Sequence, residues 1–236
     1  MQRQEISAIK SRAEQLRKTI AQMEADLGRS SERLKLKEEL IYLESLLEKH
    51  EARTAKLTRE CNLGRRFLSR TFENFNTSGN EEAFTKAKKY ADRFCQADER
   101  ISTGLLFIGN AGTGKTHLAA AIMNHLIAES IPAMFITSIE LFGLLRDFDN
   151  QKERLKKIKS VPLLVLDDLG KEKITDWNRE KLFEIINARY EDYLPVIITT
   201  NDTTRELNQN VGEAIYSRLC ETCELVPMKG KDYRKQ

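Results

Sequence analysis

The chain has little of what defines secreted, membrane-spanning or strongly charged proteins. Its four cysteines in 236 residues have no regular spacing, so they predict no disulfide framework and favour a reducing compartment. No apolar run approaches the roughly 20 residues of a membrane-spanning helix, and the first residues do not resemble a signal peptide. A net charge of only +3 neither indicates nor opposes nucleic-acid binding. We therefore expect a cytoplasmic protein with no membrane partner.

Enough hydrophobic sequence is present for a folded core. Apolar residues make up 40% of the chain and charged residues 32%, which suits a helix-rich globular protein. The length allows one ordinary domain together with a smaller module. The pattern of the sequence changes near residue 60, where we place the boundary between the two.

The first part, residues 1–60, predicts two helices with a coiled-coil seam of apolar residues three and four apart. Gly28 suits the C-terminal cap of the first helix and Ser30 or Ser31 the N-terminal cap of the second, which predicts an antiparallel hairpin. The hairpin either closes on itself as a solvated arm or keeps apolar surface for a partner protein. The seam residues are Ile6, Ile9, Ala13, Leu16, Ile20, Met23 and Leu27, then Leu36, Leu40, Leu43, Leu47, Thr54 and Leu57.

The second part follows a linker, residues 61–80, that is rich in Gly, Asn and Ser. A helix is predicted from Glu81 to Phe94, and from residue 104 onward short apolar strands alternate with helices. This pattern predicts an α/β domain over residues 81–236, with a five-stranded parallel sheet flanked by helices. The expected strands are Leu105–Ile108, Ala133–Thr137, Leu163–Leu166, Val196–Thr200 and Glu224–Val226, with helices near residues 116–129, 139–158, 178–192 and 211–222.

Residues 109–116 match the phosphate-binding pattern G-x-x-x-x-G-K-[ST], between an apolar strand and an Ala-rich helix. Its glycines let successive backbone amides point at phosphate oxygens, and the helix that begins at Lys115 adds its positive dipole. Lys115 reaches the β- and γ-phosphates, and the Thr116 hydroxyl suits Mg²⁺. We predict an ATP site formed by Gly109, Asn110, Ala111, Gly112, Thr113, Gly114, Lys115, Thr116 and His117.

The apolar strand near residue 165 ends in two carboxylates, Asp167 and Asp168. Downstream of a P-loop, this is a Walker B pattern rather than an ordinary turn. Asp167 is expected to hold Mg²⁺ directly or through water, and Asp168 to orient or deprotonate the attacking water. Many such ATPases have glutamate where Asp168 stands. Because aspartate is one methylene shorter, we expect slow hydrolysis that times a switch.

Two further polar residues are candidates for the same site. Asn201 ends the strand near residue 198. If that strand lies beside the Walker B strand, Asn201 or Thr200 is a sensor that hydrogen-bonds the attacking water. Otherwise Asn201 belongs to an ordinary turn at the strand end. Arg218 lies on the helix before the last strand, where an arginine is usually a surface charge.

A set of ordered segments makes residues 71–236 resemble the DnaC/IstB branch of the AAA+ ATPases. They are Thr-Phe-Glu-Asn-Phe (71–75), the P-loop with its continuation to Ala119, Leu-Asp-Asp-Leu-Gly (166–170), Thr-Thr-Asn (199–201), Ser-Arg-Leu (217–219) and Gly-Lys-Asp-Tyr-Arg (230–234). The resemblance implies that Arg218 is an arginine finger for the γ-phosphate of a neighbouring subunit, so that hydrolysis requires self-association. It also implies a core without a separate C-terminal lid domain.

The function expected from this resemblance is an ATP-dependent helicase loader in DNA replication. The hairpin would bind a replicative hexameric helicase, an ATPase ring or spiral would contact single-stranded DNA, and hydrolysis would release the complex. The alternative is an IstB-type transposition helper that binds and bends duplex DNA and activates a transposase. A small-molecule kinase is disfavoured, because no acceptor pocket is recognisable.

The sequence leaves the role of two basic clusters undecided. Arg65, Arg66 and Arg70 are placed to touch phosphate, but a short basic cluster is more often a solvated face. The run of lysines and arginine over residues 152–159 is either a solvated helix face or, as the resemblance implies, a contact with single-stranded DNA.

Overall fold

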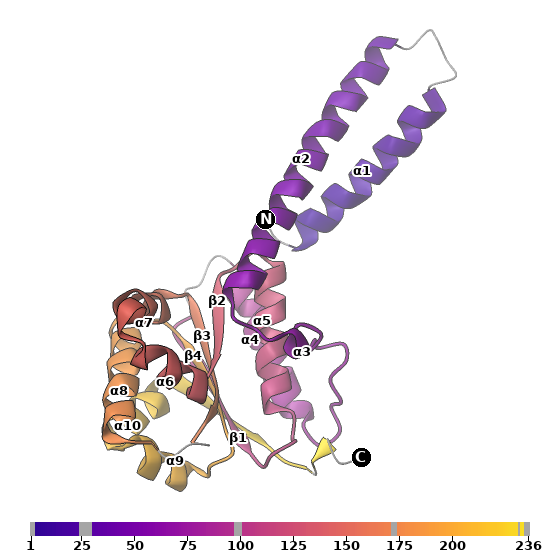
Figure 1. Cartoon of the computed structure of the whole chain (residues 1–236). Coiled ribbons are helices and arrows are strands. Elements are labelled where there is room, and N and C mark those ends of the chain that lie inside the picture. The colour runs from indigo at the N-terminus through magenta and orange to yellow at the C-terminus, as the bar shows by residue number, and fades with distance from the viewer. Residues whose placement is uncertain (1–2, 24–29, 97–100, 171–173, 231, 234–236) are drawn as a thin grey trace.

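The computed structural model describes residues 3–23, 30–96, 101–170, 174–230 and 232–233. A parallel sheet is covered by helices, and the first two helices project from it as a hairpin (Figure 1). The elements are α1 (Arg3–Met23), α2 (Ser30–Glu60), α3 (Arg65–Leu68), α4 (Glu81–Cys95), β1 (Gly104–Gly109), α5 (Lys115–Ala128), β2 (Ala133–Thr137), α6 (Ser138–Arg146), the 3₁₀ turn η2 (Phe148–Asn150), α7 (Gln151–Ser160), β3 (Leu163–Leu169), α8 (Asp176–Glu191), β4 (Val196–Thr200), α9 (Thr204–Val211), α10 (Glu213–Thr222) and β5 (Cys223–Met228).

The five strands form one parallel sheet in the order β2-β3-β4-β1-β5. The predicted parallel sheet and its five strands are confirmed, and β1, β3 and β5 are longer than expected. Because all strands run in the same direction, their carboxyl ends meet at one edge. The segments that follow β1, β3 and β4 at this edge carry the P-loop, the paired carboxylates and Asn201.

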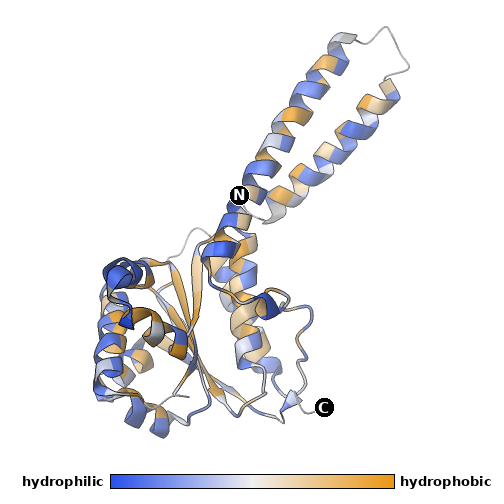
Figure 2. Ribbon diagram, in the orientation of Figure 1, coloured by the Kyte–Doolittle hydropathy of each residue, from blue (hydrophilic) through white to orange (hydrophobic). Residues whose placement is uncertain are grey.

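Successive residues of β1 to β4 enter two hydrophobic cores on opposite faces of the sheet. In β1, Leu105 and Phe107 belong to the core that includes α4 and α5, whereas Leu106 belongs to the core that includes α6, α8 and α10. This alternation is the period of two that a pleated strand imposes. Helices therefore cover both faces (Figure 1), and the apolar strands form the orange centre in Figure 2.

The hairpin follows the predicted seam in α1, whereas Thr54 and Leu57 of the predicted seam in α2 contact the α/β domain instead. Ion pairs flank it, with Arg12 Nε 2.8 Å from Glu39 Oε1 and Arg17 Nη2 2.7 Å from Glu44 Oε1. The last turns of α2 reach the α/β domain, where the hydroxyls of Thr54 and Ser130 are 3.4 Å apart. The predictions for Leu27 and Gly28 lie outside the described residues. The predicted N-terminal cap at Ser30 or Ser31 needs correction, because α2 already includes both residues. The buried apolar residues of α1 are Ile6, Ala13, Leu16 and Ile20.

Residues 61–80, expected as a linker, are packed against the domain. The backbone N–H of Phe135 in β2 donates to the carbonyl of Cys61 at 2.7 Å. Cys61, Leu63 and Phe72 are buried in the same core as α5. This connection is therefore fixed to the sheet, and α3 lies within it.

Two helix predictions need correction. The helix expected over residues 139–158 is divided into α6 and α7 by η2, because the backbone leaves the helical conformation at Asp147, where ψ is 102°. Helix α9 was missed. It begins at a capping box in which Thr203 and Glu206 bond each other's backbone N–H, and Gly212 at φ 90° separates it from α10.

Among the described residues, no helix is long and apolar enough to cross a membrane.

Candidate nucleotide-binding site

The loop between β1 and α5 needs its glycines for two separate reasons. Gly112 has φ 79° and Gly114 has φ 98°, values that L side chains rarely adopt. A Cβ at Gly112 would lie 1.8 Å from Asp232 Oδ1, and one at Gly114 would lie 2.7 Å from the ring of Phe75. The loop is thus pressed between the C-terminal segment and the segment before α4, and it leads directly into the positive end of α5.

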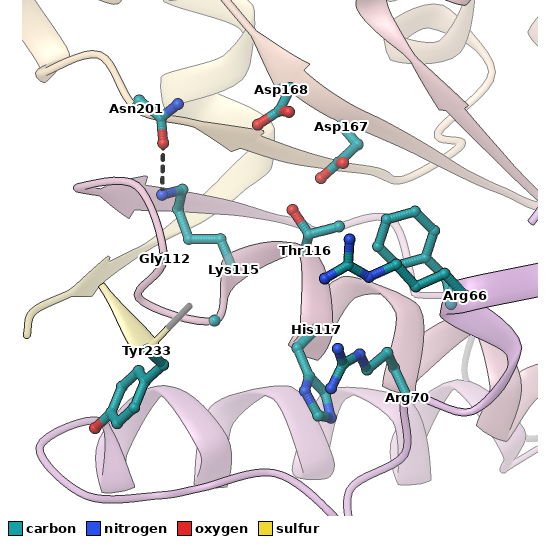
Figure 3. A pocket seen from close by; sticks show the side chains of 12 residues that line it. Arg66, Arg70, Gly112, Lys115, Thr116, His117, Asp167, Asp168, Asn201 and Tyr233 are labelled. Atoms are coloured by element: carbon teal, nitrogen blue, oxygen red, sulfur yellow. Dashed lines mark hydrogen bonds between the residues drawn. The ribbon is translucent and has the colours of Figure 1, made fainter. Parts of the chain in front are cut away.

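Lys115 is the first residue of α5, and its side chain turns back into the loop. It is only 4% exposed. Its Nζ donates to the carbonyls of Gly109 at 2.6 Å and Asn110 at 2.7 Å, and to Asn201 Oδ1 at 2.8 Å. The last of these bonds joins the P-loop to the end of β4 (Figure 3). Thr113 adds a bond from its hydroxyl to the carbonyl of Asn110 at 2.9 Å, which closes the turn.

The paired carboxylates stand at an irregularity of β3. The register between β3 and β4 shifts between Leu166 and Leu169, and Asp168 has φ 57°. A left-handed conformation at a residue other than glycine costs about 1 kcal/mol, and such strain is most often found at functional sites. The bulge directs Asp167 and Asp168 toward the P-loop rather than into the two cores (Figure 3).

Thr199 of β4 holds this bulge in place, although the sequence analysis gave it no role. Its hydroxyl donates to Asp167 Oδ1 at 2.6 Å and accepts the backbone N–H of Asp168 at 2.9 Å. The hydroxyl of Ser138 donates to the carbonyl of Asp168 at 3.0 Å. The direct pairing of β4 with β3 was the missing information, because residue 199 is remote from residue 167 in sequence.

Asp167 is 2% exposed. Burial raises its pKa to about 6, and the neighbouring Asp168 charge adds to this rise, whereas hydrogen bonds from Thr199 and Thr116 and the charge of Lys115 oppose it. A carboxylate at this position gains from a cation, because a cation offsets the charge that burial penalises.

A pocket of about 280 Å³ joins these groups. Its wall includes the P-loop, both carboxylates and Asn201, which the sequence predicted to meet, together with four residues outside that prediction (Figure 3). Those four are Arg66, Phe67, Arg70 and Tyr233. The C-terminal segment that carries Tyr233 is fastened by Asn80, whose side chain donates to the carbonyl of Lys229 at 2.8 Å and accepts its N–H at 2.9 Å.

Arg218 does not line this pocket. Its guanidinium lies against α8, 4.9 Å from the ring centroid of Phe183 and 5.5 Å from that of Tyr190. Nε donates to Asn187 Oδ1 at 2.9 Å, and Nη1 donates to the carbonyl of Ala214 at 2.8 Å. Within one subunit, Arg218 therefore belongs to the surface of α8 and α10 and not to the site of its own P-loop.

The donor set fits a magnesium–nucleotide complex. A glycine-rich loop and a lysine suit phosphate oxygens, and the Thr116 hydroxyl with the Asp167 carboxylate offers the oxygen ligands that Mg²⁺ prefers. Among the described residues, no group of three or more His, Cys, Asp or Glu side chains is placed to hold a metal ion alone. Shared coordination by protein and phosphate oxygens is the usual arrangement for Mg²⁺ at such sites.

Comparison with known proteins agrees with this geometry. The family model described as "IstB-like ATP binding protein" matches residues 11–236. The replicative helicase loader DnaC of Escherichia coli is 30% identical over 156 residues, which cover 63% of this chain and 62% of the relative. An ATP-binding protein of insertion sequence IS5376 from Geobacillus stearothermophilus is 33% identical over 138 residues, 55% of each chain.

The solved structure of the DnaC helicase loader has a TM-score of 0.62 and 30% identity, covering 70% of this chain and 100% of that one. The chain spans 57 to 65% of the length of three curated relatives that it matches.

Proposed function

The chain belongs to the family of IstB-like ATP-binding proteins, and from this premise we propose that it is an ATP-dependent helicase loader of the DnaC type. The observation that carries the proposal is the combination of a complete P-loop pocket with a helical hairpin that projects from the same domain (Figure 1). The similarity to DnaC in both sequence and structure supports the ATPase part. The hairpin is then the part that holds a replicative hexameric helicase.

ATP hydrolysis follows from the roles that the pocket residues can take. The loop amides and Lys115 bind the triphosphate, while Thr116 and Asp167 hold Mg²⁺, which neutralises phosphate charge. Asp168 accepts a proton from, or orients, the attacking water. Asn201 positions that water, and its bond to Lys115 links the P-loop to β4.

The place of Arg218 on α8 and α10 supports an action between subunits. An arginine that faces away from its own pocket reaches a γ-phosphate only when a second copy brings its own P-loop to this surface. Hydrolysis then depends on assembly, so ATP binding builds the oligomer and hydrolysis releases it. The planar guanidinium stabilises transition-state charge in a way that lysine does not reproduce.

A basic face on α7 is the proposed contact for single-stranded DNA. Arg154 and Lys159 of this helix are engaged with Asp147 and Glu184 at 2.7 and 2.6 Å. The remaining side chains of the run are exposed and suit phosphate backbone. They are Lys152, Lys156 and Lys157.

The second candidate is an IstB-type transposition helper. The specific observation in its favour is that the family match begins at residue 11 and so includes the hairpin. The relative from insertion sequence IS5376 is also similar over 55% of the chain. In this reading the hairpin contacts duplex DNA or a transposase instead of a helicase.

A pulldown with the host's replicative helicase separates the two candidates. Ile41 of α2 is 66% exposed, so we expect Ile41→Glu to abolish helicase capture by the full-length chain without unfolding it. Glu51→Ala, at another exposed position of α2, serves as the matched control. Helicase capture that needs Ile41 and ATP supports the loader. Assembly on duplex DNA with no helicase capture would refute the loader and favour the transposition helper.

A further inference from the structure

Hydrogen bonds and ring stacking hold helix α3 and the residues after it against α5, the helix that follows the P-loop, and against β2. The side chain of Asn124 on α5 donates from Nδ2 to the carbonyls of Phe67 at 2.9 Å and Arg70 at 2.7 Å. His117 Nε2 lies 2.9 Å from the carbonyl of Thr71. The ring of Phe67 stacks on Phe135 with centroids 5.6 Å apart. The backbone that carries Arg66 and Arg70 is therefore held at a fixed place beside the pocket.

Arg66 of α3 and Arg70, which follows α3, both line the pocket, whereas Arg65 of α3 does not. In Figure 3, Arg66 points toward Thr116, Arg70 lies beside His117, and Tyr233 lies across the P-loop from both. Within the part of the chain that the structure describes, the guanidinium groups of Arg66 and Arg70 form no ion pair and no hydrogen bond. Two cations are thus held at the mouth of an anion-binding pocket with their donors available to a ligand.

The place of the two arginines in the pocket indicates which phosphate of the nucleotide they contact. Thr116 and Asp167 mark the end where Mg²⁺ and the last phosphates bind, and Arg66 points toward that end (Figure 3). We propose that Arg66 and Arg70 bind the terminal phosphate of the nucleotide in their own subunit, so that the site distinguishes ATP from ADP before any second copy arrives. This inference rests on the proposed ATP site. It differs from the role of Arg218, which acts from a neighbouring subunit.

Charge balance supports the terminal phosphate, and not the inner phosphates, as the ligand of Arg66 and Arg70. The loop amides suit the inner phosphates. The terminal phosphate brings the additional negative charge that separates ATP from ADP, and guanidinium groups bind phosphate oxygens through charge-assisted, often bidentate hydrogen bonds. The loss of that phosphate removes the ligand of both arginines.

The test compares the affinity for ADP with that for the β,γ-imido analogue of ATP, each with Mg²⁺, by isothermal titration calorimetry. All full-length proteins carry Arg218→Ala, which removes the arginine of any neighbouring subunit. For Arg66→Ala/Arg70→Ala we expect at least about a tenfold loss of affinity for the analogue, because each hydrogen bond between charged groups contributes about this factor. The affinity for ADP should change less than about twofold. Arg65→Ala is the matched control and should leave both affinities unchanged.

Three results would overturn the inference. An unchanged preference for the analogue shows that these arginines do not meet the terminal phosphate, although the ATP site itself stands. An equal loss for both nucleotides shows that α3 only shapes the pocket. Failure of the parent to bind either nucleotide would refute the ATP site and this inference together. Partial recovery of analogue affinity in Arg66→Lys/Arg70→Lys supports a charge contact.

Discussion

Replacing Asp167 with asparagine should make the nucleotide-free protein more stable at neutral pH. The carboxylate is 2% exposed, and burial, with the neighbouring Asp168 charge, raises its pKa to about 6 although hydrogen bonds from Thr199 and Thr116 lower it. At neutral pH the folded protein therefore holds an ionised group that burial disfavours. Asparagine keeps the shape and the oxygen that accepts from Thr199, and it carries no charge.

The size of this gain in the unfolding free energy follows from the pKa of Asp167 in the unfolded chain and in the folded protein. A rise from 3.8 to about 6 corresponds to about 3 kcal/mol at about 1.4 kcal/mol per pH unit. The folded state binds the proton more tightly than the unfolded chain, so the Asp167 contribution to the unfolding free energy falls as pH rises from about 4 to about 6 and is level above that. We expect Asp167→Asn to gain about 3 kcal/mol at pH 8 and about half of that at pH 5.

Urea unfolding at both pH values, with a chelator and without nucleotide, measures this difference. Asp192→Asn, at an exposed position, is the control and should change the unfolding free energy by less than about 0.5 kcal/mol. A variant that is no more stable than the parent at pH 8 would refute the reasoning. A gain that is equal at pH 5 and pH 8 would also refute it, because packing rather than ionisation would then be the cause.

Three further predictions address the loop, the subunit contact and the hairpin. Gly112→Ala should lower the Tm by several degrees in a thermal melt, because the strain at φ +79° and a Cβ 1.8 Å from Asp232 Oδ1 remove about 1–3 kcal/mol of the unfolding free energy. The control Gly143→Ala, which has open space around its Cβ, should not lower the Tm. Arg218→Ala should keep ATP affinity but reduce phosphate release at high protein concentration by at least about 10³-fold, and hydrolysis at the parent's rate would contradict its action between subunits. Leu16→Ala, at a residue 2% exposed between α1 and α2, should cost about 2–4 kcal/mol of hairpin stability and weaken helicase capture while calorimetry shows unchanged ATP binding.

The sheet could be predicted because its strands are local patterns. An apolar run bounded by polar residues identifies a strand without knowledge of its neighbours. The P-loop and the carboxylate pair could be found for the same reason, since each is contiguous in sequence. The sheet order then brings the ends of β1, β3 and β4 together, as adjacent parallel strands require.

The remaining parts of the site depend on tertiary contacts. Thr199 reaches Asp167 only through the pairing of β3 and β4. Arg66 and Arg70 lie at the pocket where Asn124 fixes the backbone of this segment to α5, and without that contact the sequence favoured a solvated face. The missed start of α9 did have a local signal, the Thr203 and Glu206 capping box.

The central claim is that the loop from Gly109 to Thr116 binds a triphosphate with Mg²⁺, and equilibrium binding of ATP to the purified chain tests it most directly. With Mg²⁺ we expect saturable binding, and for Lys115→Ala at least about a tenfold loss of affinity, because a charge-assisted contact to phosphate is removed. A parent chain that binds no ATP in the presence of Mg²⁺, or a Lys115→Ala variant that binds as the parent does, would contradict the account.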